Sequence, residues 1–282
     1  MTTKSSTAWM RLKPTIKTIV RRGNFILGHL NPGRFKLSIE RVHLTLPNLP
    51  PALDGLVIAH LSDFHHSAVV PRSYLDEVVA CCNALQPDLI VLTGDFVAAD
   101  PRYADPCAEA LAALTAPRGR FAVLGNHDHK VDARRVTEAL RGVGITVLLN
   151  EGEELYPGFW VVGLDDAARK HADLPGTMAR LQNAPGDVVL LLVHEPDLAD
   201  EVQHYPVTLQ LSGHSHGGQI RLPLLTYFTL PRLGRRYWRG LRRVGSLWLY
   251  TTRGVGMSDL LPLRLNCPPE LTLLTLHTIQ EG

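Results

Sequence analysis

The segment IAHLSDFH, residues 58–65, joins an apolar run to a carboxylate and an imidazole that stand two positions apart. Four further segments have the same design: VLTGDF (91–96), FAVLGNHD (121–128), LLLVHEPD (190–197) and LQLSGHSH (209–216). Each continuous apolar run is typical of a strand that is covered on both faces. Since sites in α/β sheets form beyond the carboxyl ends of strands, the pattern predicts that these polar side chains converge.

The rest of the chain alternates between predicted strands and helices. Residues 37–46 alternate apolar and polar positions, as a half-exposed strand does, and a further strand is expected at 145–149. Helical spacing of apolar residues is found at 73–86, 104–115 and 132–142, with a short helix expected at 176–183. Early α/β alternation followed by a strand-rich C-terminal part predicts an α/β fold of two packed sheets flanked by helices.

Composition narrows the class of protein. The chain has 282 residues, of which 45% are hydrophobic and 20% charged, as in soluble globular proteins. No run of 18 apolar residues is present, so the sequence indicates no transmembrane helix. The four cysteines lack CxxC spacing, which argues against a zinc knuckle or a disulfide framework.

The N-terminal segment differs from the remainder, and we expect residues 1–36 to be a basic appendage to a domain spanning 37–282. Its basic residues are mixed with apolar ones, as in segments that lie on anionic lipid. Arg21 and Arg22 resemble a twin-arginine signal, but GHLNPGRFK (28–36) is a poor apolar region, so export is not expected. We expect a cytoplasmic protein and leave open a peripheral contact with the inner membrane.

The residues at the strand ends specify metal chemistry. Oxygen and nitrogen donors without thiolates suit Mn²⁺, Fe or Zn²⁺, and seven of them exceed what one tetrahedral ion accepts. We therefore expect two divalent metal ions that share one carboxylate. Gly94, Gly125 and Gly213 precede donors, where the backbone must bend without a Cβ. The expected ligands are Asp63, His65, Asp95, Asn126, His194, His214 and His216.

The order SDFH, TGD, GNHD, VHEPD, GHSHGGQ resembles the calcineurin-like metallophosphoesterase family over about residues 40–278. GHSHGGQIRLP, LGRRYWRGL and CPPELTLLTL are similar to the bacterial YaeI/YkuE-like branch. The resemblance implies a four-layer α/β/β/α sandwich of mixed sheets. It also implies hydrolysis of a phosphate ester or pyrophosphate bond by in-line attack of water that two metal ions activate.

The resemblance further implies a role for each matching residue. The first ion would be held by Asp63, His65 and His216, the second by Asn126, His194 and His214, with Asp95 bridging. Asn126 and His127 would neutralise the phosphoryl group, and His127 would protonate the leaving alkoxide. Asp128 either orients His127 or caps the following helix.

Other polar residues near the motifs are harder to assign. Ala98 stands where related Ser/Thr phosphatases carry an acid, which argues against a protein phosphatase. Asp100 is expected in a surface loop. Asp165 and Asp166 follow another predicted strand, and either of them could line the substrate cleft.

The substrate is the least determined point. Residues 220–243 are apolar, aromatic and rich in arginine, so they could contact a bilayer or an acyl chain while Arg235 and Arg236 bind phosphates. An ordinary hairpin with solvated arginines is the alternative. The resemblance implies a nucleotide-linked lipid such as UDP-2,3-diacylglucosamine as a substrate. Two alternatives remain, a general phosphodiesterase of nucleotides or nucleic acid and a non-catalytic membrane-bound metal-binding protein; no specific nucleic-acid partner is expected.

Overall fold

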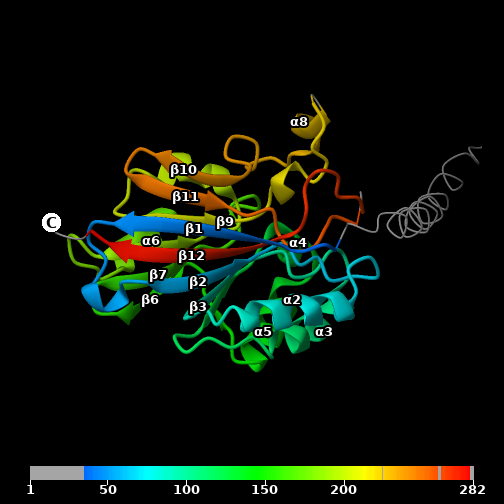
Figure 1. The fold of residues 1–282 in the computed structure, drawn as a ribbon, viewed down its shortest axis with the longest axis horizontal. Coiled ribbons are helices and arrows are strands. Elements are labelled where there is room, and N and C mark those ends of the chain that lie inside the picture. The colour runs from blue at the N-terminus through cyan, green and yellow to red at the C-terminus, as the bar shows by residue number, and fades with distance from the viewer. Residues whose placement is uncertain (1–34, 224, 260–261, 280–282) are drawn as a thin grey trace, which may run out of the picture.

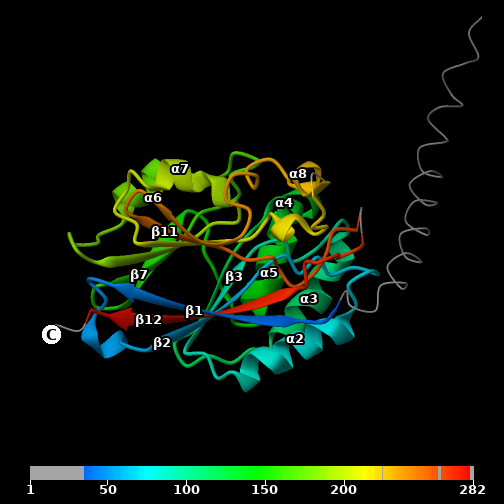
Figure 2. The ribbon, with the colours of Figure 1, turned by 45° about the horizontal axis from the view of Figure 1, so that its top comes forward.

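A computed structural model of the protein describes residues 35–279 except 224, 260 and 261. Two six-stranded sheets lie face to face and helices cover their outer faces (Figures 1 and 2). The predicted α/β fold of two mixed sheets flanked by helices is therefore confirmed. The predicted appendage lies, as far as residue 34, outside the described residues, and the division at residue 37 stays a prediction.

The first sheet has the strand order β1-β12-β2-β3-β4-β5. Strands β2 to β5 are parallel, β12 is antiparallel to β2, and β1 is parallel to β12. The carboxyl ends of β2, β3 and β4 consequently share one edge. The bounds are β1 Ser38–Leu46, β2 Leu56–Leu61, β3 Leu89–Thr93, β4 Arg120–Val123, β5 Thr146–Val147 and β12 Glu270–Thr278.

The second sheet has the order β10-β11-β9-β8-β7-β6. Its four central strands are parallel, and β6 and β10 are antiparallel strands at its two edges. The loop after β9 touches the loop after β2, so the carboxyl ends of both sheets face one end of the molecule. The bounds are β6 Glu151–Tyr156, β7 Phe159–Gly163, β8 Val188–Leu192, β9 Leu209–Ser212, β10 Gly240–Val244 and β11 Leu247–Thr251.

Three apolar layers hold the sheets and helices together. One lies between the first sheet and helices α2 (Arg72–Ala84), α3 (Ala104–Leu111) and α5 (Ala133–Gly142). A second fills the space between the sheets, and a third lies beneath α6 (Leu174–Arg180) and α7 (Ala199–Val202). Helices α4 (Asn126–Val131) and α8 (Leu225–Thr229) stand at the end where the strand ends meet (Figure 1). Within the described ranges, no helix has the length and apolar character that crossing a bilayer requires.

Three features differ from the sequence-based expectation or escape it. The strand expected at 145–149 pairs only over Thr146–Val147. The edge strands β6, EGEELY, and β10, GLRRV, are largely solvated and carry charged residues, so they lack the apolar pattern of a strand. Strand β12 inserts between β1 and β2, a pairing between the two ends of the described chain that local patterns cannot reveal.

The layer between the sheets predicts a contrast between two isoleucines. Ile58 in β2 is fully buried there, whereas Ile39 in β1 is 40% exposed. Ile58→Ala should lower the free energy of unfolding by about 2–5 kcal/mol, because it leaves a cavity. The matched change Ile39→Ala should cost less than about 1 kcal/mol, since little buried surface is lost. Urea unfolding measures both, and equal losses would contradict this description of the core.

Candidate metal centre

The loops that follow β2, β3, β4, β8 and β9 bring the predicted ligands together. Ligand atoms of Asp63, His65 and His216 lie within 4.8 Å of one another, as do those of Asp63, Asp95 and His194. Asp95, Asn126, His127, His214 and His216 line a cleft of about 360 Å³ that opens beside these groups. Asp63 and His216 belong to the same cluster, so residues up to 153 positions apart in sequence form one site.

Asp95 lies at the middle of this cluster. Its Oδ2 is 3.4 Å from His65 Nε2 and 3.3 Å from His194 Nε2. Its Oδ1 accepts a hydrogen bond of 2.8 Å from the backbone N–H of His127. One carboxylate oxygen is thus fixed by the backbone, and the other stands between the two proposed ligand sets, where a shared carboxylate must be.

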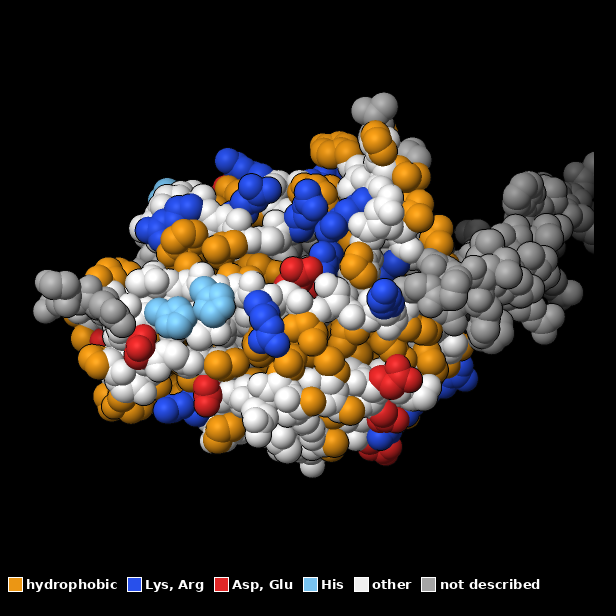
Figure 3. All heavy atoms as spheres, in the orientation of Figure 1, with side chains coloured by type: hydrophobic (Ala, Val, Ile, Leu, Met, Phe, Trp, Pro, Cys, Tyr) orange, Lys and Arg blue, Asp and Glu red, His pale blue; other side chains and the backbone are white. Residues whose placement is uncertain are grey.

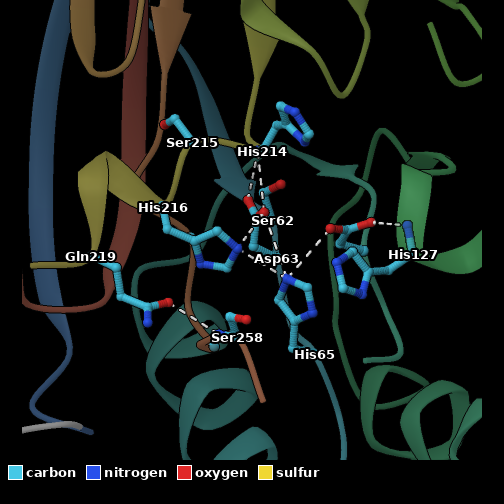
Figure 4. A network of polar contacts seen from close by, with 12 residues as sticks. Ser62, Asp63, His65, His127, His214, Ser215, His216, Gln219 and Ser258 are labelled. Atoms are coloured by element: carbon cyan, nitrogen blue, oxygen red, sulfur yellow. Dashed lines mark hydrogen bonds and ion pairs between the residues drawn. The ribbon is translucent and has the colours of Figure 1, made fainter. Parts of the chain in front are cut away.

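The proposed first set is equally close. His216 Nε2 lies 3.3 Å from Asp63 Oδ1 and 3.0 Å from His65 Nε2. The N–H of His214 donates to both Asp63 oxygens at 3.1 Å. Figure 4 shows His65 and His216 pointing toward each other beside Asp63. Two imidazole nitrogens and a carboxylate oxygen therefore converge on one small volume.

The proposed second set shows which ring nitrogens are available. His194 Nδ1 donates to the carbonyl of Thr93 at 2.6 Å, and His214 Nε2 donates to the carbonyl of Arg232 at 2.7 Å. These bonds leave His194 Nε2 and His214 Nδ1 for other partners. Asn126 Oδ1 is buried without a hydrogen-bond partner, and His194 Nε2 faces the Asp95 carboxylate at 3.3 Å. Buried polar atoms are normally satisfied, so the unpaired Asn126 Oδ1 fits a site built to hold a cation.

The protonation states of the cluster agree with that fit. Burial lowers the pKa of His65 to about 3 and that of His214 to about 4, and burial beside His65 lowers the pKa of His216 well below its usual range. These imidazoles are neutral at physiological pH, as metal ligands must be. Burial with the charge of Asp95 raises the pKa of Asp63 to about 6.

Asp95 and His194 behave as an ion pair. Burial opposes charge on both groups, yet the imidazole of His194 lowers the pKa of Asp95, and the carboxylate of Asp95 raises the pKa of His194 well above its ordinary value. The pairing therefore favours a proton on His194 beside an ionised Asp95. A cation bound at His194 Nε2 must displace that proton.

The backbone at the site is held in an unusual conformation. Five of the proposed ligands have positive φ: Asp63, 55°; His65, 46°; Asp95, 56°; His214, 67°; and His216, 51°. Non-glycine residues rarely adopt this region, and each such residue costs of order 1–3 kcal/mol. The presence of five such residues in one site indicates that the surrounding structure fixes the ligands in locally unfavourable backbone conformations.

The glycines beside the ligands allow the ligand loops to approach one another closely. Gly94 has φ of +88°, and a Cβ on it would lie 2.5 Å from the N atom of Gly125. Gly213 has no positive φ, but a Cβ there would collide with Ser62 and the Asp63 carboxylate. All three glycines therefore stand where a Cβ would be in the way, as expected, and of the three only Gly94 also has positive φ.

Asp128 joins two of the ligand loops. Its buried carboxylate accepts backbone N–H bonds from Gly125 (3.0 Å), Asp95 (2.8 Å), Phe96 (2.9 Å) and Val97 (3.2 Å). It therefore caps α4 and fixes the loop that carries Asp95. Of the two roles considered for Asp128, the capping role matches these contacts.

His127 is oriented by a different group. Its Nδ1 donates to the carbonyl of Ala98 at 2.6 Å. A backbone carbonyl, and not the Asp128 side chain, therefore fixes the ring of His127. Because Nδ1 is committed, Nε2 is the ring nitrogen free to act on a substrate.

The structure also places the remaining predicted residues. Asp100 caps a short turn by accepting from Arg102 N at 3.1 Å, as expected of a surface loop. Asp165 pairs with His129 at 2.6 Å, and Asp166 is fully buried. Neither Arg235 nor Arg236 lines the metal cleft. Arg236 is paired with Asp200 at 2.7 Å, whereas Arg235 lines a neighbouring pocket.

Sequence reasoning missed two residues that shape the site, Arg264 and Gln219. Arg264 is buried and donates to the carbonyls of Gly256 (2.8 Å) and Arg253 (2.8 Å), which holds this loop against Asp63. Gln219 lines the cleft and accepts from Ser258 N at 3.0 Å (Figure 4). Gln219 follows directly on the GHSHGG motif, whereas no local pattern marks Arg264.

Comparison with known proteins identifies the family. The sequence model of the calcineurin-like phosphoesterase family matches residues 56–218. This chain belongs to that family. The predicted family resemblance and the expected phosphoesterase class are thereby confirmed. Members of the family use a dinuclear divalent metal centre, and the clustered His and Asp side chains supply candidate ligands for one.

Three relatives span nearly the whole chain. The uncharacterized metallophosphoesterase YkuE of Bacillus subtilis is 37% identical, covering 89% of this chain and 88% of its own. The phosphodiesterase YaeI of Escherichia coli is 35% identical, covering 94% and 97% respectively. The UDP-2,3-diacylglucosamine pyrophosphatase LpxG of Chlamydia trachomatis is 28% identical, covering 87% and 90%.

The contacts of Asp128 lead to a stability prediction. Asp128→Asn replaces one accepting oxygen by an amide donor that faces backbone N–H groups, so about 2–4 kcal/mol of unfolding free energy should be lost. Asp100→Asn is the matched control, because Asn is an equally good cap in an exposed position, and should change stability by less than about 0.5 kcal/mol. Chemical denaturation tests both, and an unchanged stability of the Asp128 variant would refute the joining role.

The pair of His129 and Asp165 predicts a pH dependence. Despite the opposing effect of burial, Asp165 raises the pKa of His129, and His129 lowers the pKa of Asp165. Stabilisation from His129 is complete below its unfolded pKa near 6.5 and is lost as pH rises through its folded value. Stabilisation from Asp165 is present above about pH 3.9 and is lost as pH falls through its folded value.

Both contributions are present between these limits. Asp165→Asn should therefore destabilise the protein by at most about 1 kcal/mol near pH 5, since the pair is half-buried. The difference from the wild type should shrink at about pH 9, where His129 is neutral. Urea unfolding of the two proteins at both pH values measures it, and a difference that grows with pH would show the sign to be wrong.

Proposed function

We propose that this protein is a dinuclear-metal-dependent phosphodiesterase or pyrophosphatase that acts on a membrane-associated substrate. One observation carries the catalytic part. Seven oxygen and nitrogen donors from five loops, the buried Asp95 carboxylate among them, converge at the strand ends, and the Asn126 Oδ1 atom is buried without a hydrogen-bond partner. Such a donor set suits Mn²⁺, Fe or Zn²⁺.

Each proposed residue has a separate task. Asp63, His65 and His216 would hold one ion, Asn126, His194 and His214 the other, and Asp95 both. Two divalent ions there would polarise phosphoryl oxygens and lower the pKa of water. His127 would present its Nε2 to the leaving-group oxygen, with its ring fixed through Nδ1 by the Ala98 carbonyl.

The substrate class rests on two observations. LpxG, a relative that aligns with most of this chain, is named as a UDP-2,3-diacylglucosamine pyrophosphatase. In addition, the exposed Phe228 lines the metal cleft together with Thr229 and Pro231, so an apolar wall adjoins the polar centre. A substrate with a phosphate bond next to an apolar group, such as a nucleotide-linked lipid, matches the polar centre and the apolar wall.

A substrate panel tests this proposal against its alternatives. With added Mn²⁺ we expect hydrolysis of bis-p-nitrophenyl phosphate and faster turnover of UDP-2,3-diacylglucosamine than of single-stranded DNA. A preference for DNA would favour the general nuclease alternative. Tight metal binding without turnover of any of the three would favour a non-catalytic metal-binding protein.

His127 gives the sharpest test of mechanism. His127→Ala should retain the metal ions but lower turnover roughly 10²–10⁴-fold if the imidazole protonates the leaving group. The loss should be smaller for p-nitrophenyl esters than for alkyl esters, since nitrophenolate leaves without a proton. Metal content is measured alongside, and equal turnover by variant and wild type would remove His127 from catalysis.

A further inference from the structure

Helix α8 carries the most exposed apolar side chains among the described residues. Phe228 is 79% exposed and Tyr227 is 59% exposed, on consecutive positions of a helix that projects from the molecule (Figure 1). Their rings lie edge to face at 6.3 Å. Two neighbouring aromatic rings in water are an unfavourable arrangement unless another surface covers them.

One arginine lies over the Tyr227 ring, and others line the pockets beside it. The Arg235 guanidinium lies 5.5 Å above the Tyr227 ring, and both residues line a pocket of about 420 Å³ with Arg239. Arg239 in turn lines the adjoining pocket with Arg242 of β10. Figure 3 shows Lys and Arg side chains on this face, between the strands and the apolar tip. We call Tyr227, Phe228, Arg235, Arg239 and Arg242 the α8 surface.

Arg235, Arg239 and Arg242 form no ion pair within the described part of the chain, and the two glutamates that line the pocket beside Arg239 and Arg242, Glu40 and Glu270, are paired with Arg253. Residues 202–258 contain no Asp or Glu. Among the described residues, no carboxylate lies within ion-pair distance of Arg235, Arg239 or Arg242, whereas Arg236 next to them is paired with Asp200. Aromatic rings flanked by uncompensated arginines are the features of segments that enter the interface of an anionic bilayer.

We propose that the α8 surface docks this protein on an anionic lipid bilayer, with Tyr227 and Phe228 entering the headgroup boundary. Phe228 also lines the metal cleft, so docking there places the mouth of the cleft at the bilayer surface. This inference deepens the proposed function, because it names the surface that would present lipid phosphates to the centre. Docking itself requires no turnover, so the two proposals fail separately.

Single-stranded nucleic acid is the competing occupant, because arginines and aromatic rings also bind bases and phosphates. The bilayer fits better, since Phe228 is the most exposed large apolar side chain among the described residues and no arginine of those residues is found over its ring. Cosedimentation of the full chain with vesicles is the experiment. The vesicles contain phosphatidylcholine with or without phosphatidylglycerol, and single-stranded DNA is added as a competitor.

We expect the wild type to bind vesicles with phosphatidylglycerol and to be released by high salt. The double change Tyr227→Ser with Phe228→Ser should weaken binding about tenfold or more. Arg239→Gln with Arg242→Gln should weaken it by a similar factor, at about fivefold per arginine. Two control variants should leave vesicle binding unchanged. Ile279→Ser removes another exposed apolar side chain, and Arg102→Gln with Arg134→Gln removes the same charge elsewhere.

Several outcomes would overturn the proposal. One is vesicle binding that both α8-surface double variants retain but Arg21→Gln with Arg22→Gln loses, which would assign the contact to the N-terminal segment. Others are equal binding to neutral vesicles, release of the protein from vesicles by DNA, or no vesicle binding at all.

Hydrolysis of bis-p-nitrophenyl phosphate by the Arg239/Arg242 variant is followed in parallel and should match that of the wild type. Loss of this hydrolysis would place the two arginines in the catalytic site instead.

Discussion

The position of the Asp95 carboxylate is the constraint on which the rest of the site depends. One oxygen is held by the backbone of the GNHD loop, and the other lies between imidazoles from both sheets. Burying this charge is unfavourable unless it is paired. A proton on His194 compensates the negative charge of Asp95 when no cation is bound. Bound cations would compensate the same charge.

The fold is arranged to meet this constraint. Two sheets contribute their parallel strand ends to one end of the molecule, and the loops cross so closely that Gly94 and Gly213 leave no room for a Cβ. Asp128 and Arg264, neither of which is proposed to bind a cation, hold the crossing loops through backbone N–H and carbonyl groups. Conformational energy spent at five residues with positive φ is offset by this network and by the three apolar layers beneath it.

Much of this arrangement could be predicted from the sequence, for identifiable reasons. Buried parallel strands leave continuous apolar runs, so the polar residues within LSDFH and VLTGD mark strand ends without knowledge of the fold. Chemical type then limits what such residues can bind. The sequence therefore predicts the ligand donors, and the structure brings the Asp and His side chains among them into adjoining clusters.

The remainder could not be predicted because it depends on contacts distant in sequence. Arg264 holds the loop whose Gly256 N–H donates to the carbonyl of Asp63, far away in sequence, and β12 pairs with strands from the other end of the described chain. The sequence does not distinguish the two roles of Asp128, because an acid that caps the following helix and an acid that orients His127 would stand at the same position. Arg235 and Arg236 look alike in sequence, but Asp200 neutralises only Arg236.

The central claim is that two cations share the Asp95 carboxylate. Anomalous diffraction from crystals of the protein grown with Mn²⁺ tests this most directly, because it locates the ions themselves. The account predicts two peaks, one beside Asp63, His65 and His216 and the other beside Asn126, His194 and His214, both in contact with Asp95. A single peak, or two peaks of which neither contacts Asp95, would contradict it.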